Sequence, residues 1–224
     1  MTAASPPHPI REGPPIAFAR REPASWRQRF LVRVAPWREH RGVRVAVTTF
    51  RDAVEETGIA KVFAALDILH DIVPAQLERI PTMMHGLAIT RLRDALGAWR
   101  KDIGICVLDE TFVVNVDTTP HDVASVIVHE LTHARLGHAG FRYAGEARAR
   151  CERVCFLAER NFALRLPPSE ERDRLLARNE GYLAMSPAYW SDEQIEARRA
   201  TRPMWERAIY RIAQIIRRSR RGAT

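Results

Sequence analysis

Residues 126–135 read Val-Ile-Val-His-Glu-Leu-Thr-His-Ala-Arg, and this stretch indicates both the fold and the chemistry of the chain. On an α-helix, side chains four residues apart lie one turn apart on the same face. His129 and His133 have this spacing, so both imidazoles can reach one metal ion. Glu130 follows the first histidine and can take a proton from a water molecule on that metal. The stretch therefore predicts a helix that carries a metal site.

The residues around this stretch support a helix. Thr118-Thr119 supplies a threonine N-cap, and Pro120 fits the first helical position. Apolar residues then recur at helical spacing, namely Val123, Val126, Ile127 and Leu131. Gly137 is a natural helix stop, so the prediction is a helix over residues 120–137. The apolar run over residues 103–108 predicts a strand before it.

Two histidines do not complete a zinc site, because zinc in proteins takes at least three protein ligands. The candidates for the third ligand are His138, Glu146 and Glu152. At about 100° per residue, a continuing helix would turn His138 away from the site. Glu146 lies near the predicted start of the next helix, where the helix dipole favours an acid without any metal.

Glu152 is the preferred third ligand. Residues 145–166 predict a second helix with an apolar stripe formed by Cys155, Phe156, Ala158, Phe162 and Leu166. Glu152 continues this stripe one turn earlier, so it is expected to face inward. A buried carboxylate needs a counter-charge, which a metal ion supplies. His138 and Glu146 remain the alternatives.

The motif His-Glu-x-x-His, followed after eighteen residues by a glutamate on the next helix, resembles the gluzincin division of zinc metallopeptidases. The resemblance covers about residues 103–166. It implies a zincin-like fold, in which a small sheet lies over an active-site helix that is followed by a glutamate helix. It also implies that His129, His133 and Glu152 bind Zn²⁺ and that Glu130 is the general base.

The sequence departs from two branches of that division. The spacing equals that of the membrane-alanyl-type aminopeptidases, but their Gly-x-Met-Glu-Asn loop is missing here. The thermolysin type has a supporting aspartate four residues after its zinc glutamate, and Phe156 occupies that position in this chain. The resemblance therefore extends to the division and to neither branch.

Length and composition predict one folded domain. A chain of 224 residues can bury a single good core. Residues 1–24 are Pro-rich and predict a flexible segment, so the domain is expected to span residues 25–224 as an α+β, mainly helical fold. The net charge of +8 comes from arginines spread along the chain, and it favours a solvated basic surface. Only Lys61 and Lys101 are lysines.

The chain lacks the patterns of a secreted or membrane protein. Its first twenty residues contain no apolar core of a signal peptide, and it has no run of eighteen apolar residues. Its three cysteines do not suggest a secreted disulfide framework. We therefore expect a cytoplasmic protein.

The sequence also predicts the other elements of the chain. Residues 51–72 predict an amphipathic helix, and residues 169–184 a short one. Strands are expected over residues 30–34, 43–47 and 87–92, and Trp99 is expected in a turn. Residues 191–219 predict a last helical stretch that is kinked at Pro203. Its apolar face, formed by Trp205, Ala208, Ile209, Ile212 and Ile216, is expected to dock on the core, and contact with an anionic membrane or nucleic acid is the alternative.

These residues favour a zinc-dependent hydrolase that cuts a peptide or protein substrate, with Glu130 as general base. The candidate donors to the developing oxyanion are Tyr143, His138 and Arg148. One alternative function is a metal-stabilised binding or regulatory module that does not cleave, but such a module would not need Glu130. A narrower one is a regulatory protease with a single protein target.

Overall fold

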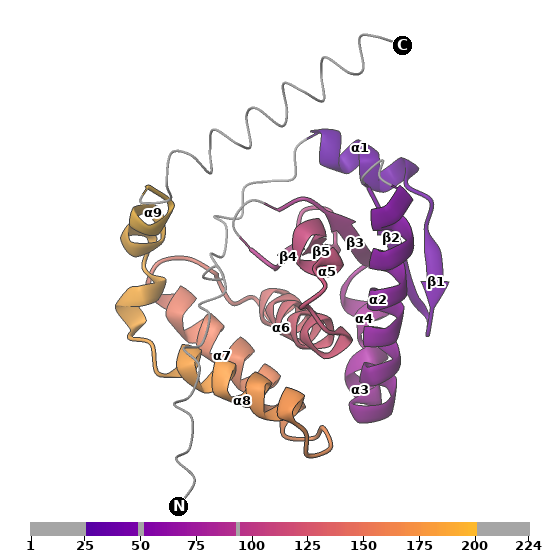
Figure 1. The fold of residues 1–224 in the computed structure, drawn as a ribbon. Helices are drawn as coiled ribbons and strands as arrows, with labels where there is room; N and C mark the ends of the chain where they lie inside the picture. The colour runs from indigo at the N-terminus through magenta and orange to yellow at the C-terminus, as the bar shows by residue number, and fades with distance from the viewer. Residues whose placement is uncertain (1–25, 49–51, 93–94, 201–224) are drawn as a thin grey trace, which may run out of the picture.

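The computed structural model describes residues 26–48, 52–92 and 95–200 (Figure 1). The predicted flexible segment over residues 1–24 and the predicted apolar face beyond Pro203 lie outside the described residues. The described chain is mainly helical and contains one mixed five-stranded sheet, which confirms the α+β prediction.

The sheet has the strand order β1-β2-β3-β5-β4. The strands span Arg38–His40 (β1), Val43–Val47 (β2), Gly86–Thr90 (β3), Gly97–Arg100 (β4) and Ile105–Asp109 (β5). β3 pairs in parallel with both β2 and β5. The outer strands β1 and β4 run antiparallel to their neighbours. β5 is buried over its whole length, as expected for a central strand that is covered on both faces.

Most of the helices lie on one face of this sheet (Figure 1). They span Trp26–Val34 (α1), Asp52–Ile72 (α2), Pro74–Leu77 (α3), Ile80–Met83 (α4), Glu110–Val114 (α5), Pro120–His138 (α6), Glu146–Ala163 (α7), Glu170–Leu183 (α8), Pro187–Trp190 (η1) and Asp192–Ala200 (α9). α6 lies in the middle of the molecule, between α2 and α7, and α8 packs along the outer side of α7.

The alternation of side chains along the strands builds two apolar layers. Leu87 and Ile89 of β3 join the main core with α2 and α6, whereas Ala88 faces the opposite side. On that opposite side, Val32 of α1 and Trp37 pack against the cluster formed by Ala88, Ile105 and Val107. The strand period of two therefore separates the layer that contains α6 from the layer that contains α1.

α6 begins with the cap that the sequence predicts. Thr119 is the N-cap, and its Oγ1 accepts a hydrogen bond from the Asp122 backbone N–H at 3.2 Å. The Asp122 side chain accepts one from the Thr119 N–H at 3.0 Å, which completes a capping box. The helix starts at Pro120, so the predicted start is confirmed.

Three local predictions were wrong. Residues 30–34 lie in helix α1, where Val32 packs on the sheet while Phe30 is exposed, so the helical register overrides their β-like composition. Trp99 lies in strand β4 and not in a turn. Gly137 does not stop α6, which ends at His138. A Cβ at Gly137 would lie 2.4 Å from the Trp99 ring, so glycine is needed here for a close approach between helix and strand.

Candidate metal centre

The predicted metal helix is unusually deeply buried. Every residue of α6 from Asp122 to Ala134 is buried, including both histidines of the motif. The exposed fraction is 3% for His129, 3% for His133 and 2% for Glu130. Burying polar side chains in this way is costly unless each one has a partner, so their partners indicate what the site does.

Glu152 of α7 faces the two histidines, as the sequence predicts. Its Oε2 lies 3.4 Å from His129 Nε2, and its Oε1 lies 3.4 Å from His133 Nε2. The two Nε2 atoms are 3.1 Å apart. In a tetrahedral site with zinc bonds of about 2.0–2.1 Å, ligand atoms are separated by about 3.3 Å. The three side chains therefore converge with the spacing of zinc ligands.

Electrostatics in this cluster favour a cation. Burial alone would lower the pKa of His129, but the carboxylates of Glu152 and Glu159 outweigh it and raise that pKa to about 10. Burial would raise the pKa of Glu152, but His133 and His129 outweigh it and lower that pKa to about 2. Glu152 Oε2 is buried and accepts no hydrogen bond from the described residues, although it lies 3.4 Å from His129 Nε2. A divalent cation could coordinate this oxygen, so the residues fit a metal ion.

Cys155 offers a second choice for the third ligand. Its Sγ and the ligand nitrogens of His129 and His133 all lie within 4.8 Å of one another. Burial, followed by the nearby negative charge of Glu152, raises the pKa of the Cys155 thiol well above its usual value. Glu152 lies 3.4 Å from the Nε2 atom of each histidine and already carries negative charge, so we prefer Glu152 as the ligand.

Sequence reasoning missed Glu159, a buried carboxylate of α7. Its Oε1 lies 2.6 Å from His129 Nδ1, so it holds the ring nitrogen that faces away from Glu152. Glu159 follows Glu152 by seven residues, two helical turns, and therefore lies on the same face of α7. That spacing is a signal that was available in the sequence. Phe156, which lies four residues after Glu152, has no carboxylate that could hydrogen-bond to His129 in this way.

Glu130 is bound to the edge of the sheet. Its Oε2 accepts a hydrogen bond of 2.6 Å from the backbone N–H of Trp99 in β4. Gly97 allows this contact, because a Cβ there would lie 2.6 Å from Val126 Cγ1 and 3.1 Å from Glu130 Cγ. Glu130 is thus fixed beside the cluster by a strand that the sequence did not predict.

The three candidate oxyanion donors are not equally placed. The Tyr143 hydroxyl donates a hydrogen bond to Glu152 Oε1, and its ring packs edge-on against His133 with the centroids 5.0 Å apart. Arg148 is buried, pairs with Asp192 and lies over the Tyr143 ring. His138 points elsewhere, because its Nε2 lies 3.0 Å from the carbonyl oxygen of Met83. Of the three candidates, Tyr143 is the one whose hydroxyl group hydrogen-bonds to the cluster.

The two alternative third ligands, His138 and Glu146, lie at different places in the structure. His138 is directed to Met83 and is not brought to the cluster. Glu146 is the first residue of α7, almost two turns before Glu152. That His129, His133 and Glu152 bind zinc stays a prediction, and their convergence is the observation behind it.

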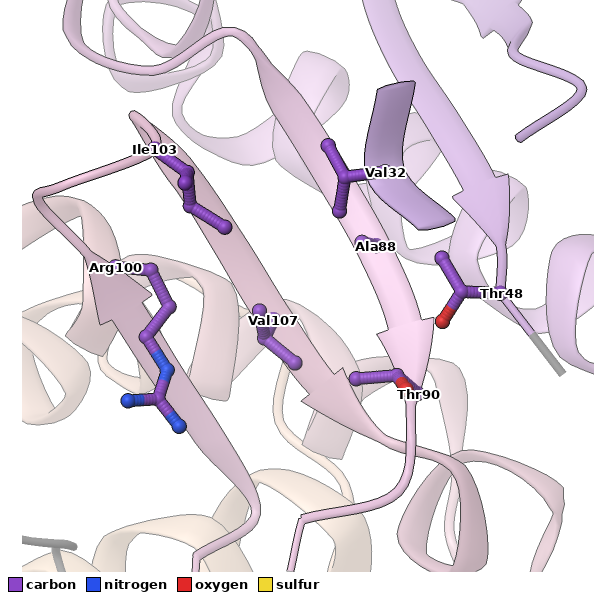
Figure 2. A pocket seen from close by; sticks show the side chains of 7 residues that line it. All are labelled: Val32, Thr48, Ala88, Thr90, Arg100, Ile103 and Val107. Atoms are coloured by element: carbon purple, nitrogen blue, oxygen red, sulfur yellow. The ribbon is translucent and has the colours of Figure 1, made fainter. Parts of the chain in front are cut away.

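A small depression lies elsewhere in the structure (Figure 2). It is lined by Val32, Thr48, Ala88, Thr90, Arg100, Ile103 and Val107. Ala88 and Val107 belong to the layer of the sheet that faces α1, on the side opposite α6. The depression is therefore separate from the metal cluster.

The chain matches no known protein family, curated protein or solved structure. Among the described helices, none has the length and apolar character needed to cross a membrane. The chemistry of the cluster is therefore the main guide to function.

Proposed function

We propose that this protein is a zinc-dependent hydrolase, most simply a peptidase, with His129, His133 and Glu152 as zinc ligands. The observation that carries the proposal is the convergence of these three buried side chains beside Glu130. Two histidines and one carboxylate are the ligand set of several catalytic zinc sites, in which a fourth position is left for water or substrate. The arrangement of sheet, α6 and α7 supports a zincin-like assignment.

Zinc held by these residues would act as a Lewis acid, which acidifies water and polarises a carbonyl group. Glu130 would accept the proton of the attacking water on its carboxylate and pass it to the leaving amine nitrogen. The hydrogen bond from the Trp99 N–H to Glu130 Oε2 fixes the carboxylate, so the base is already oriented before proton transfer. The Tyr143 hydroxyl, which donates to Glu152 Oε1 in this structure, would turn to the substrate carbonyl oxygen as its negative charge grows.

The edge of the sheet supports a peptide substrate. Among the described strands, β4 pairs only with β5. An extended peptide can bind at such an edge through backbone hydrogen bonds. Because Glu130 bonds to β4 itself, a peptide at this edge would lie beside the proposed base.

A metal-stabilised module without catalytic activity is the second candidate, and the burial of the cluster favours it. Both histidines and Glu130 are at most 3% exposed, and Cys155 could complete a closed site with four protein ligands. A closed site stabilises a fold but leaves no position for water. Glu130 favours the hydrolase, because a closed site has no use for a base.

Metal analysis and mutagenesis separate the two candidates. We expect one zinc per chain in the wild type, loss of zinc in Glu152→Ala and retention of zinc in Cys155→Ala. Glu130→Gln should keep zinc and lose hydrolysis of a peptide library, because an amide cannot accept the proton. A thiolate-to-metal charge-transfer band in the cobalt form, together with unchanged zinc in Glu152→Ala, would favour the closed site and overturn the hydrolase.

A further inference from the structure

Helix α8 supplies no ligand to the cluster, yet its side chains reach the residue that holds His129. We propose that Glu159, Ser125 and Arg178 form a positioning chain that fixes the His129 ring for metal binding. The inference rests on the proposed zinc site and names what orients its first ligand. It begins at the ring nitrogen that faces away from the cluster.

Glu159 sets the tautomer of His129. The distance of 2.6 Å from His129 Nδ1 to Glu159 Oε1 is that of a strong hydrogen bond, and both side chains are buried. A carboxylate at Nδ1 keeps a proton on that nitrogen, so Nε2, which faces His133 and Glu152, is the nitrogen left to bind the metal. A histidine held in this way does not have to be ordered when the metal arrives.

Ser125 and Arg178 in turn hold Glu159. The Ser125 hydroxyl donates to Glu159 Oε2 at 2.6 Å, and its oxygen accepts from Arg178 Nη2 at 3.1 Å. Arg178 Nη2 also lies 3.4 Å from Glu159 Oε2. A buried carboxylate is stable only when its charge is compensated, and Arg178 contacts it in addition to His129. The positioning chain therefore leads from Arg178 of α8 to Ser125 of α6, then to Glu159 of α7, which holds His129 of α6.

The same helix contains a matched control for Arg178. Arg174 lies one turn earlier and binds Asp122 through both terminal nitrogens, at 3.0 and 2.9 Å. Arg178 binds the same carboxylate at 3.0 Å. Within the described part of the chain, Arg174 forms its hydrogen bonds and ion pairs with Asp122 and Glu171, and none with Ser125 or Glu159. The two arginines thus share the Asp122 contact and differ in their reach toward the proposed chain.

Zinc affinity and the stability of the metal-free protein should be measured together for the full-length chain. Competition with a chromophoric chelator gives the affinity, and thermal unfolding in excess chelator gives the stability. We expect Glu159→Gln to weaken zinc binding by about 10–100-fold, the range for loss of a carboxylate that supports a zinc histidine. Arg178→Gln and Ser125→Ala should weaken it by smaller factors. Arg174→Gln should keep the wild-type affinity even where it lowers the melting temperature.

Two results would overturn the positioning chain. One is wild-type zinc affinity in Glu159→Gln, Ser125→Ala and Arg178→Gln. The other is an equal loss of affinity in Arg174→Gln and Arg178→Gln, which would indicate general loosening of the α6–α8 contact. If Glu159→Gln does not fold, the Ser125 and Arg178 variants decide alone.

The control for the metal site itself is His129→Ala. Loss of zinc in His129→Ala together with normal binding in the three chain variants would remove only this inference. A wild-type protein that binds no zinc would remove both this inference and the proposed function. The cobalt form adds a spectroscopic readout, because a His129 ring that has rotated away would change the ligand-field bands whereas a purely structural loss would not.

Discussion

Replacing Gly137 with alanine tests how β4 is held against the helix of the proposed site. The new Cβ would lie 2.4 Å from Trp99 Cζ3 and 2.6 Å from Trp99 Cη2. Non-bonded carbon atoms prefer about 3.5–4.0 Å, so the ring or the helix must move by about 1 Å. Overpacking of this kind costs about 1–3 kcal/mol, while alanine in a helix gains about 0.5–1 kcal/mol over glycine. The net result should be neutral to clearly destabilising.

Gly181→Ala is the matched control. Gly181 lies near the end of α8, as Gly137 lies near the end of α6, but a Cβ there meets no atom within 4 Å. This variant should only gain the helix propensity of about 0.5–1 kcal/mol. The difference between the two variants is then the overpacking alone, about 1–3 kcal/mol.

Calorimetry or denaturant unfolding measures this difference directly. For a chain of this size, each kcal/mol corresponds to about 2–4 °C in melting temperature, so the variants should differ by about 2–12 °C. Because the Trp99 N–H binds Glu130, a displaced β4 should also slow any hydrolysis, whereas Gly181→Ala should not. Equal stabilisation by both alanines would refute the packing of Trp99 on Gly137.

Three further outcomes are expected. Gly97→Ala should lower stability and hydrolysis while zinc stays bound, because the atoms nearest to the new Cβ belong to Val126 and Glu130; zinc content and turnover measure this. Burial raises the pKa of Asp122, but its hydrogen bonds and ion pairs with Arg174 and Arg178 outweigh this and hold the pKa below its usual value. A lowered pKa stabilises the fold above the unfolded value of about 3.9 and ceases to do so as the pH falls, so wild type and Asp122→Asn should converge in stability below about pH 4. Truncation after residue 203 should lower the melting temperature if the apolar face beyond it docks on the core; unchanged stability with lost, salt-sensitive binding to anionic vesicles or DNA would favour the surface-contact alternative.

The sequence predicted the parts of the site that depend on local spacing. His129 and His133 are one turn apart, and Thr119 and Asp122 form a capping box within four residues, so both features follow from helix geometry alone. Glu152 required only one more inference, that α7 has an inward face. In each case the residues that determine the structure are close together in the chain.

The parts that were missed depend on contacts between distant residues. Trp99 meets Glu130 across 31 positions, and nothing in the short run around Trp99 indicates that it forms an outer strand. Arg178 reaches Glu159 from a separate helix, and one arginine in an arginine-rich sequence carries no signal of that role. The spacing of Glu159 to Glu152 was a usable signal, but a glutamate among charged neighbours also fits an exposed surface position. Tertiary structure, not local propensity, selects these partners.

The buried polar residues of α6 are not those expected if the helix served stability alone. Its buried stretch contains the polar side chains Ser125, His129, Glu130, Thr132 and His133, where an apolar helix would pack at lower cost. The chain compensates group by group: Glu159 binds His129, the Trp99 N–H binds Glu130, and the Thr132 hydroxyl binds the Val128 carbonyl oxygen. Among the described residues, none donates a hydrogen bond to Glu152 Oε2, at the point where three ligand groups converge. A cation there would complete the compensation, and metal binding would then stabilise the folded chain in proportion to the logarithm of the metal concentration over its dissociation constant. The cost of burying this helix and the proposed activity therefore have a common explanation in the same three side chains.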